Sequence, residues 1–467
     1  MQAPQKKSVK RVEMTYRLRV GRVQIRRLIL TTLALALGIC ACVMPPANIR
    51  QSSDAQAFWP NKVCKNCHNK IFGQHTQSYH DRSFSNPVFL AQYFKDVLPR
   101  AEKDPAIMIA AEECISCHAP VFYMTNKRHV GTKDEVADIP GIDCDFCHTI
   151  TGYRNKIPGG GNYISDLGNE RKLGPFSHEY NWHHVYSELH TRSEFCGICH
   201  DAVNRFGLQT GATYTQWKRS IYAKNGIQCQ DCHMNVRGFL SEGLPVYESG
   251  SATADMPLIA SQYREKLYTH LFPGAHSKSQ IMGAGSLSLG IVVEKTVISP
   301  GDLLEITVLV DNTKTGHKMP SGSAALRHLW VELEADINGK SFRIPAESRD
   351  TETGYALAGG GDFDMEILGN DIPPGSRVYR VVYKDASGKQ TLSSFDAVGI
   401  AFDNCLDAAE MRKEKYHFRI PEGSKGTLSL KAGLMYLSYP GSFAKRLGLP
   451  AAEPFEIGVS RKLITVQ

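Results

Sequence analysis

The residues best equipped for chemistry are ten cysteines arranged in five copies of one pattern. In each copy, two residues separate the cysteines and a histidine follows the second cysteine directly. The five segments are Cys64-Lys-Asn-Cys67-His68, Cys114-Ile-Ser-Cys117-His118, Cys144-Asp-Phe-Cys147-His148, Cys196-Gly-Ile-Cys199-His200 and Cys229-Gln-Asp-Cys232-His233. This spacing is typical of c-type haem attachment, in which both thiols add to vinyl groups and the adjacent imidazole binds the iron. The sequence therefore predicts five covalently bound haems c.

Zinc sites and redox-active dithiols also use paired cysteines. Neither requires a histidine after every second cysteine, and five such repeats in 467 residues do not arise by chance. The remaining cysteines are Cys40 and Cys42, which fall in the N-terminal leader, and Cys405. We interpret Cys405 as a partly buried thiol without a redox or cross-linking role.

A haem that only transfers electrons needs a second strong axial ligand, whereas an open sixth position admits a substrate. Two candidates follow from position alone. His184 and His190 precede Cys196, and a helix over residues 187–199 would bring them near the haem attached there. A second group of histidines is interpreted as solvated or hydrogen-bonded, with His276 as a reserve ligand: His75, His129, His178, His183, His276, His328 and His417.

The five attachment segments lie within residues 64–233, a stretch too short to bury an ordinary hydrophobic core around five cofactors. The porphyrins must therefore supply much of the core. Successive segments start 50, 30, 52 and 33 residues apart, so long and short gaps alternate. The short gaps predict that haems two and three, and haems four and five, form close pairs suited to electron hopping.

The hydrophobic pattern of the sequence changes after about residue 285, where apolar residues begin to alternate with polar ones. Ile306, Val308 and Val310 share one face of an expected strand, and Asn338-Gly339 is a type I′ hairpin signal. Further strands are expected over residues 329–334, 378–383, 416–420 and 427–437. We predict an α+β multidomain chain: a mostly helical, loop-rich pentahaem domain over residues 48–284 and an antiparallel β-sandwich over residues 285–467.

The N-terminus has the form of an export leader. Nine Lys or Arg residues and one Glu in residues 1–27 account for the whole net charge of +7, so the rest is close to neutral and a nucleic-acid-binding function is excluded. An uncharged apolar run follows from residue 28. Within the leader, residues 1–47, three outcomes remain open: a lipidated Cys42, cleavage after Ala47, or an uncleaved anchor. Each implies export to the periplasm, the outer membrane or the cell surface.

Several stretches resemble multihaem c-type cytochromes of the superfamily that contains hydroxylamine oxidoreductase and its tetrahaem redox partner. The likeness rests on residues 64–80, 141–150, 215–234 and 316–322, the last reading Gly-His-Lys-Met-Pro-Ser-Gly. The resemblance implies that His80, His270 and His317 are distal ligands. It also implies that His317 would clamp the β-domain onto the haem chain.

Three functions fit these observations. The first is a pentahaem electron-transfer protein without a substrate site, which exchanges electrons with other redox proteins. The second is an oxidoreductase of small nitrogen or sulfur compounds with a five-coordinate haem. The third is a subunit of a homo-oligomeric or larger cytochrome assembly, attached to a membrane through its N-terminus. At least five histidines are candidates for distal ligands, enough to fill the sixth position of every haem, and this favours the first function.

Overall fold

The computed structural model describes residues 58–125, 128–166, 170–176, 184–238, 240–253, 262–272, 274, 287–347, 357–359 and 371–467. These residues all belong to one compact unit. The leader prediction for residues 1–47, with Cys40 and Cys42, and the histidines His178, His183 and His276 lie outside the described residues. None of the described helices has the length and apolar character that crossing a bilayer requires.

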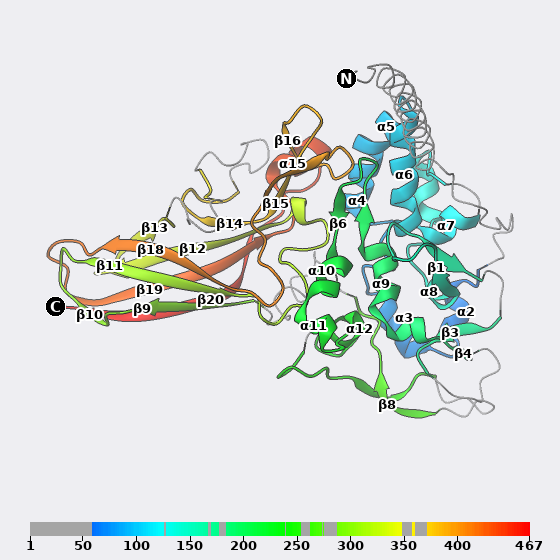
Figure 1. Ribbon diagram of the computed structural model, residues 1–467, viewed down its shortest axis with the longest axis horizontal. Helices are drawn as coiled ribbons and strands as arrows, with labels where there is room; N and C mark the ends of the chain where they lie inside the picture. Colours follow the sequence, from blue (N-terminus) through cyan, green and yellow to red (C-terminus); the bar gives the residue numbers. More distant parts are fainter. Residues whose placement is uncertain are drawn as a thin grey trace, which may run out of the picture. The chain divides into compact units, whose positions relative to one another are not determined.

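Short helices carry the attachment segments in the first half of the chain (Figure 1). Four of these helices end at the histidine of their segment: α6 (Pro105–His118), α8 (Cys144–His148), α9 (Ser193–His200) and α12 (Cys229–His233). The first segment differs, because α2 (Asn61–Lys65) ends before His68, which caps α3 (Asn69–His75). The other helical elements of this half are α4 (Pro87–Gln92), the π-helical stretch η2 (Tyr93–Val97), α5 (Leu98–Ala101), α7 (Pro120–Thr125), η3 (Lys133–Asp138), η4 (Glu188–Thr191), α10 (Thr213–Arg219) and α11 (Ile221–Lys224).

Helix starts in this half follow local sequence signals. Asn86 accepts hydrogen bonds from the first backbone N–H groups of α4, and Asp104 and Asp143 do the same for α6 and α8. Proline occupies the first position of α4 and α6, where its missing N–H costs nothing. These caps fix where the helices carrying the second and third segments begin.

The helix expected over residues 187–199 is wrong in part. The chain forms a single 3₁₀ turn, η4, and then extended backbone at Arg192 (φ −114°, ψ 148°), and only α9 is an α-helix. His190 lies in the turn, and His184 lies on the strand β4 (His184–Tyr186), which pairs with β3 (Lys172–Gly174). Neither histidine projects from the helix that carries Cys196.

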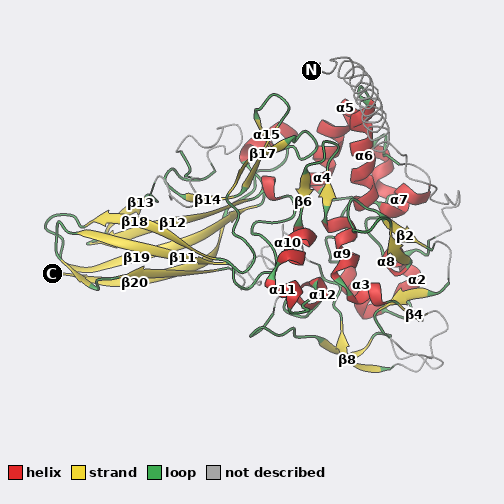
Figure 2. Cartoon of the chain, viewed as in Figure 1, coloured by secondary structure: helices red, strands yellow, loops and turns green. Residues whose placement is uncertain are grey.

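Short strand pairs complete the first half of the chain. They are β1 (Ile150–Tyr153) with β2 (Tyr163–Ser165), β5 (Ala202–Val203) with β6 (Gln209–Gly211), and β7 (Glu248–Ser251) with β8 (Tyr263–Leu267). Helices and these small strand pairs are therefore interleaved around the attachment segments (Figure 2).

The second half of the chain is dominated by strands in three sheets. The largest has the order β10 (Val297–Ile298), β20 (Phe455–Val466), β19 (Gly426–Leu437), β12 (His328–Ile337), β13 (Lys340–Ile344), with β14 (Arg377–Tyr379) also paired to β12. The second has the order β18 (Met411–Arg419), β11 (Leu303–Asp311), β9 (Ser288–Val293), and the third β16 (Gln390–Thr391), β15 (Val381–Lys384), β17 (Gly399–Asp403). All pairs within them are antiparallel except β10 with β20. Two short helical elements, η5 (Ala324–Leu326) and α15 (Gly441–Leu447), accompany the sheets.

Local predictions for this half hold at several strands and fail at one. Ile306, Val308 and Val310 are buried on one face of β11, and Asn338 and Gly339 take the positive φ values of 55° and 73° that a type I′ turn needs. The single strand expected over residues 378–383 is instead two strands in different sheets, β14 and β15. The chain switches sheets at Arg380, whose buried guanidinium donates to the Ala325 carbonyl at 2.6 Å and meets His328 at 3.0 Å.

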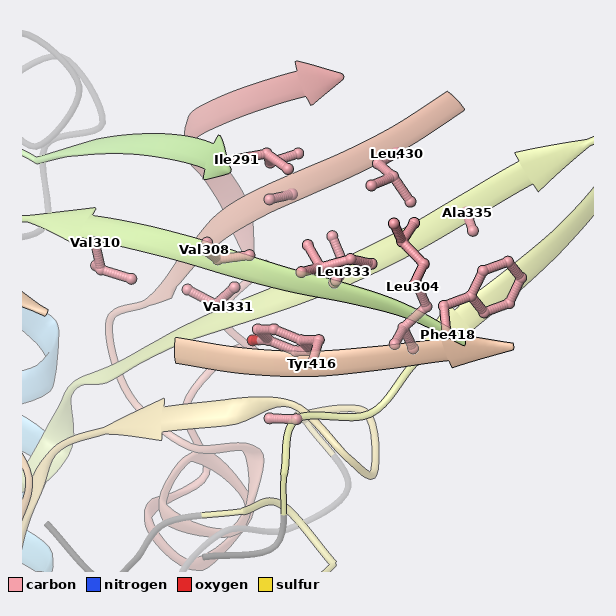
Figure 3. Packing of buried hydrophobic residues seen from close by; sticks show 14 of the residues in the cluster. Ile291, Leu304, Val308, Val310, Val331, Leu333, Ala335, Tyr416, Phe418 and Leu430 are labelled. Carbon is pink, nitrogen blue, oxygen red and sulfur yellow. The ribbon is translucent and has the colours of Figure 1, made fainter. Parts of the chain in front are cut away.

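One hydrophobic cluster joins the first two sheets. Val308 on β11, Leu333 on β12 and Leu430 on β19 are all fully buried in it, together with Tyr416 on β18 (Figure 3). Side chains from the two sheets therefore share one core, which stabilises their packing.

Replacing Leu333 by alanine should lower the free energy of unfolding by about 2–5 kcal/mol, because a fully buried side chain leaves a cavity. The matched control is Leu463→Ala on β20, where the side chain is 63% exposed and the expected change is within about 0.5 kcal/mol. Guanidinium titration followed by far-ultraviolet circular dichroism measures both. An equal decrease in the free energy of unfolding for the two variants would contradict the assignment of Leu333 to the core.

Candidate haem-binding sites

None of the ten cysteines of the five segments is part of a disulfide. Cysteines of different segments lie side by side, close enough to change one another's pKa: Cys64 beside Cys144, Cys117 beside Cys199, and Cys196 beside Cys229. The first segment therefore adjoins the third, the second adjoins the fourth, and the fourth adjoins the fifth. The expected pairing of haems two and three, and of haems four and five, concerns the positions of the cofactors and stays a prediction.

The third segment also approaches the fourth. The pKa of Cys196 and Cys199 is raised mainly by their neighbours Cys229 and Cys117 and by burial, and Cys147 lies close enough to add to this shift. The fourth segment thus has neighbours in the second, third and fifth segments.

The cysteines differ in their electrostatic surroundings. Burial raises the pKa of Cys114, Cys147 and Cys232 to about 12, whereas a neighbouring cysteine lowers the pKa of Cys64, Cys117 and Cys229. Within the part of the chain that the structure describes, no three His, Cys, Asp or Glu side chains converge as they would around one ion. The pairs of thiols fit thioether attachment better than metal–thiolate coordination.

The histidines of the first three segments share one orientation. In each, the ring Nδ1–H donates to a backbone carbonyl, so that Nε2 is the nitrogen that would bind a metal. The acceptors are Ala252 O for His68 at 2.8 Å, Ser83 O for His118 at 2.9 Å and Leu173 O for His148 at 2.5 Å. A hydrogen bond at the second nitrogen is the usual way in which a protein fixes the tautomer of a ligating imidazole.

Three of the five segment histidines face a second imidazole. The ring centroids of His200 and His80 are 6.1 Å apart, and those of His233 and His317 are 6.2 Å apart. His148 faces two rings, His190 at 5.8 Å and His270 at 6.4 Å. Two metal–nitrogen bonds of about 2 Å each, plus half of each ring, come to about 6 Å. These separations therefore fit an iron between two imidazoles.

Burial keeps the facing rings in the neutral form that ligation requires. Desolvation lowers the pKa of His80 and His270 to about 3 and that of His233 to about 4, and it lowers the pKa of His317 and His200 as well. Nearby imidazoles add to the effect at His80, His233 and His270. All five rings are therefore uncharged at neutral pH.

A tight backbone crossing positions His80. Gly141 lies so close that a β-carbon there would come within 2.6 Å of the His80 carbonyl oxygen. This close approach lets the Ile142 N–H donate to that oxygen at 2.9 Å. Ser83 completes the crossing by donating from its hydroxyl to the His118 carbonyl at 2.7 Å. Gly141 is thus required where the segment before Cys144 passes His80.

The loop after β11 positions His317. The His317 Nδ1–H donates to the Lys318 carbonyl at 3.0 Å, and the His317 carbonyl accepts from the Thr315 hydroxyl at 2.9 Å. Contacts to α10 hold the loop in place, because the Lys318 N–H donates to Gln216 at 3.1 Å and a β-carbon at Gly316 would lie 3.2 Å from the Trp217 ring. His317 therefore reaches His233 from the β-sheet half of the chain.

His184 and His190 use Nε2 differently from the segment histidines. The Nε2–H of His190 donates to the Cys147 carbonyl at 3.0 Å, and its Nδ1 is buried without a hydrogen-bond partner. The Nε2–H of His184 donates to the Phe176 carbonyl at 2.6 Å. In both residues the nitrogen that ligates in most haem proteins is occupied by a carbonyl.

Sequence reasoning missed the surroundings of His118. The Phe89 ring stacks on the His118 ring with centroids 4.0 Å apart and an interplanar angle of 12°. Among the described residues, no second histidine ring faces His118. Phe89 belongs to an ordinary apolar helix pattern, so no sequence signal singled it out.

Comparisons with known proteins agree with this description. Residues 63–149, which contain the first three attachment segments, match the family model for cytochrome c554 and c-prime. No curated protein matches the chain. The solved penta-heme cytochrome c552 from Thermochromatium tepidum has 18% sequence identity and a TM-score of 0.57, with 88% of this chain and all of that chain covered (100%). The CARDB domain of PF1109 from Pyrococcus furiosus has 12% identity and a TM-score of 0.17, with 39% of this chain and 87% of that chain covered.

At 18% identity, the match to the penta-heme cytochrome c552 establishes a shared fold over most of the chain. The family-model match adds sequence evidence for the first part of the cytochrome-like half. Together with the Cys-x-x-Cys-His segments and the facing imidazoles, these findings support a multihaem c-type cytochrome that binds haem c covalently.

Proposed function

We propose that this chain is an exported electron-transfer protein that carries five haems c. The observation that carries the proposal is the set of facing imidazoles: His200, His233 and His148 each have a buried, neutral ring at the distance that a bound iron would require. Two axial imidazoles favour electron transfer, because they leave no position for a substrate. When bound, haem supplies a one-electron iron couple; the residues of the chain orient it and exclude water.

The ligand set follows from the ring nitrogens. We propose His80 as the second ligand beside His200, and His317 beside His233. For the site of His148 we propose His270, because its Nδ1–H donates to the Tyr268 carbonyl at 3.0 Å and its Nε2 remains available. His190 would instead hold the backbone of the third segment through Cys147, and His184 would brace Phe176.

The thiol contacts support a path for electrons. Haems attached at neighbouring cysteines would lie close together, and three such pairs are present: Cys64 with Cys144, Cys117 with Cys199, and Cys196 with Cys229. We propose that electrons pass between the first and third, the second and fourth, and the fourth and fifth haems along these contacts. The close approach of Cys147 to Cys196 would connect the third haem to the fourth.

We further infer that residues 48–284 form the haem domain and residues 285–467 a β-domain in which two sheets pack as a β-sandwich. The shared core around Val308 and Leu333 supports the sandwich. Direct contacts would bind the β-domain to the haem domain: Tyr222 donates to the Thr313 carbonyl at 2.6 Å, and Arg100 forms an ion pair with Asp396. With His317 as a ligand, the β-domain is part of the redox apparatus.

The cellular setting belongs to the same proposal. Haem is attached to c-type cytochromes outside the cytoplasm, so we propose a periplasmic or cell-surface location and a leader that ends in cleavage, lipidation at Cys42 or an anchor. Other redox proteins would be the electron donor and acceptor, with a homo-oligomer or larger assembly as a further possibility. We also place the chain, as a proposal, near the superfamily of hydroxylamine oxidoreductase.

One observation favours a second function. His118 has Phe89 stacked on its ring and, in the described ranges, no facing histidine. A haem attached at Cys114 and Cys117 would then keep an open sixth position, where a small nitrogen or sulfur compound could bind. This alternative predicts a high-spin signal from the haem at His118 in the unaltered protein and an enzymatic activity at that site.

The exported protein should carry five covalent haems, because five intact attachment segments are present. Mass spectrometry of the mature protein should show five haem additions. The double variant Cys64→Ala/Cys67→Ala should show four. Fewer than five additions in the unaltered protein would contradict the proposal.

Replacing His317 by alanine should convert one low-spin haem to high spin and shift its potential, because the ring facing His233 is removed. His317→Met should keep that haem six-coordinate and raise its potential. Low-temperature EPR and a redox titration measure both effects. The matched control is His417→Ala, since His417 lies on β18 and pairs with Glu347 at 2.6 Å. An EPR spectrum unchanged by His317→Ala would remove the β-domain from the electron path.

His270→Ala and His190→Ala should separate the two rings that face His148. We expect a new high-spin signal from one haem in His270→Ala, because the available Nε2 is lost. His190→Ala should produce no new high-spin signal, because only a hydrogen bond to Cys147 is lost. The reverse pattern in the EPR spectra would make His190 the ligand.

A further inference from the structure

The first attachment segment is the most open of the five. Its helix, α2, has no buried residue, whereas each of the other segment helices buries at least one: Ile115 in α6, Phe146 in α8, Ile198 in α9 and Gln230 in α12. Five residues between positions 62 and 69 are exposed, and we call them the α2 surface: Lys62, Val63, Lys65, Asn66 and Asn69. An attachment helix that buries nothing leaves its cofactor near the solvent.

The charge of this surface also differs from that of the other segments. Lys65 stands between the two cysteines of the first segment, where the third and fifth segments have Asp145 and Asp231. Within the described part of the chain, neither Lys62 nor Lys65 forms an ion pair. Lys65 instead lies over the Phe72 ring, with its Nζ 5.4 Å from the centroid. The α2 surface is therefore cationic.

An apolar side chain lies among these charges. Val63 is 42% exposed, and the two asparagines of the α2 surface are uncharged hydrogen-bonding groups beside it. A small apolar centre with a charged rim is typical of short-lived redox encounters, which bury little area and rely on electrostatic steering for speed. Opposite charge on a partner raises its rate of association at low ionic strength.

The same surface is connected to the rest of the attachment segments. Cys64 in α2 lies beside Cys144 of the third segment, close enough for Cys144 to lower its pKa. The His68 ring is held from the other side, where its Nδ1–H donates to the Ala252 carbonyl next to β7. A partner docked on α2 would therefore lie next to the first haem and one contact away from the third.

We propose that the α2 surface is the docking site for a redox protein with an acidic surface, through which electrons enter or leave the chain. The inference rests on the proposed electron-transfer function. Each event moves one electron between the first haem and the partner. The iron of that haem is oxidised as the partner is reduced, or the reverse, and no proton is transferred and no covalent bond forms or breaks.

A second cationic row provides a matched control. Lys413 and Lys415 are exposed on β18, far from α2 in the described unit (Figure 1). No attachment segment lies on β18, and His417 in the same row is paired with Glu347. Lys413→Glu/Lys415→Glu changes the total charge as much as Lys62→Glu/Lys65→Glu but leaves the α2 surface intact.

Stopped-flow oxidation of the dithionite-reduced full chain tests the proposal with two small probes. Hexacyanoferrate(III) takes one electron to become hexacyanoferrate(II), and hexaammineruthenium(III) likewise becomes the ruthenium(II) complex. At low ionic strength, Lys62→Glu/Lys65→Glu should slow oxidation by hexacyanoferrate about tenfold and speed oxidation by the ruthenium complex, and about 0.5 M salt should remove both effects. Lys413→Glu/Lys415→Glu should change neither rate by more than about twofold.

Carbodiimide cross-linking adds a readout that does not depend on electron flow. With an acidic flavodoxin as the probe, mass spectrometry should locate cross-links at Lys62 and Lys65 and lose them in Lys62→Arg/Lys65→Arg, because arginine keeps the charge but does not form the amide. That variant should keep the hexacyanoferrate rate.

Two results would overturn the inference. The first is equal oxidation rates for the two charge-reversal variants, and the second is cross-links that gather on β18. A protein that shows no haem bands or cannot be reduced by dithionite would instead defeat the proposed function itself, so the two failures are distinguishable.

Discussion

The distance between facing imidazoles is the constraint on which the rest of this structure depends. About 6 Å must separate two buried neutral rings, and each ring must present the correct nitrogen to the space between them. The chain orients such rings with backbone carbonyls, as at Leu173 for His148 and at Lys318 for His317. Since carbonyls are fixed by the path of the backbone, the loops and caps around the sites determine the ligand geometry more than the helices do.

This constraint explains why short elements are sufficient in the first half of the chain. A five-residue helix such as α8 is not stable alone, because helix nucleation costs more than a few hydrogen bonds return. Here Asp143 caps it, Asp145 within it pairs with Lys172 at 2.6 Å, and His148 is tied to Leu173. The two halves also share apolar clusters: Phe395 packs with α5 and α6, and Phe443 of α15 packs with Ala91 of α4. The second half thus stabilises the first as well as adding strands to it.

Sequence patterns predicted the parts of this fold that local chemistry determines. The attachment segments, the alternation of β11 and the turn at Asn338 all follow from a few neighbouring residues. The features that sequence patterns did not predict depend on contacts between residues far apart in the sequence. The break at Arg380 arises because its side chain bonds to η5 and His328, far away in sequence, and the spatial pairing of the segments arises from the path of the chain between them. The proposal of His270 over His190 as the ligand opposite His148 likewise depends on which ring nitrogen donates to a backbone carbonyl. The spacing of residues in the sequence does not predict such contacts.

The contacts around Cys196 and Cys199 have a consequence for robustness. Cys196 lies beside Cys229, Cys199 lies beside Cys117, and Cys147 is near both, so the fourth segment has three neighbouring segments, more than any other. On the proposed path, loss of the second or fifth haem would leave the remaining haems connected, and loss of the third would cut off only the first. Loss of the fourth would separate the second haem, the fifth haem and the pair formed by the first and third from one another. Tolerance to mutation should therefore be spread unevenly over five segments that look equivalent in the sequence, with the least tolerance at α9.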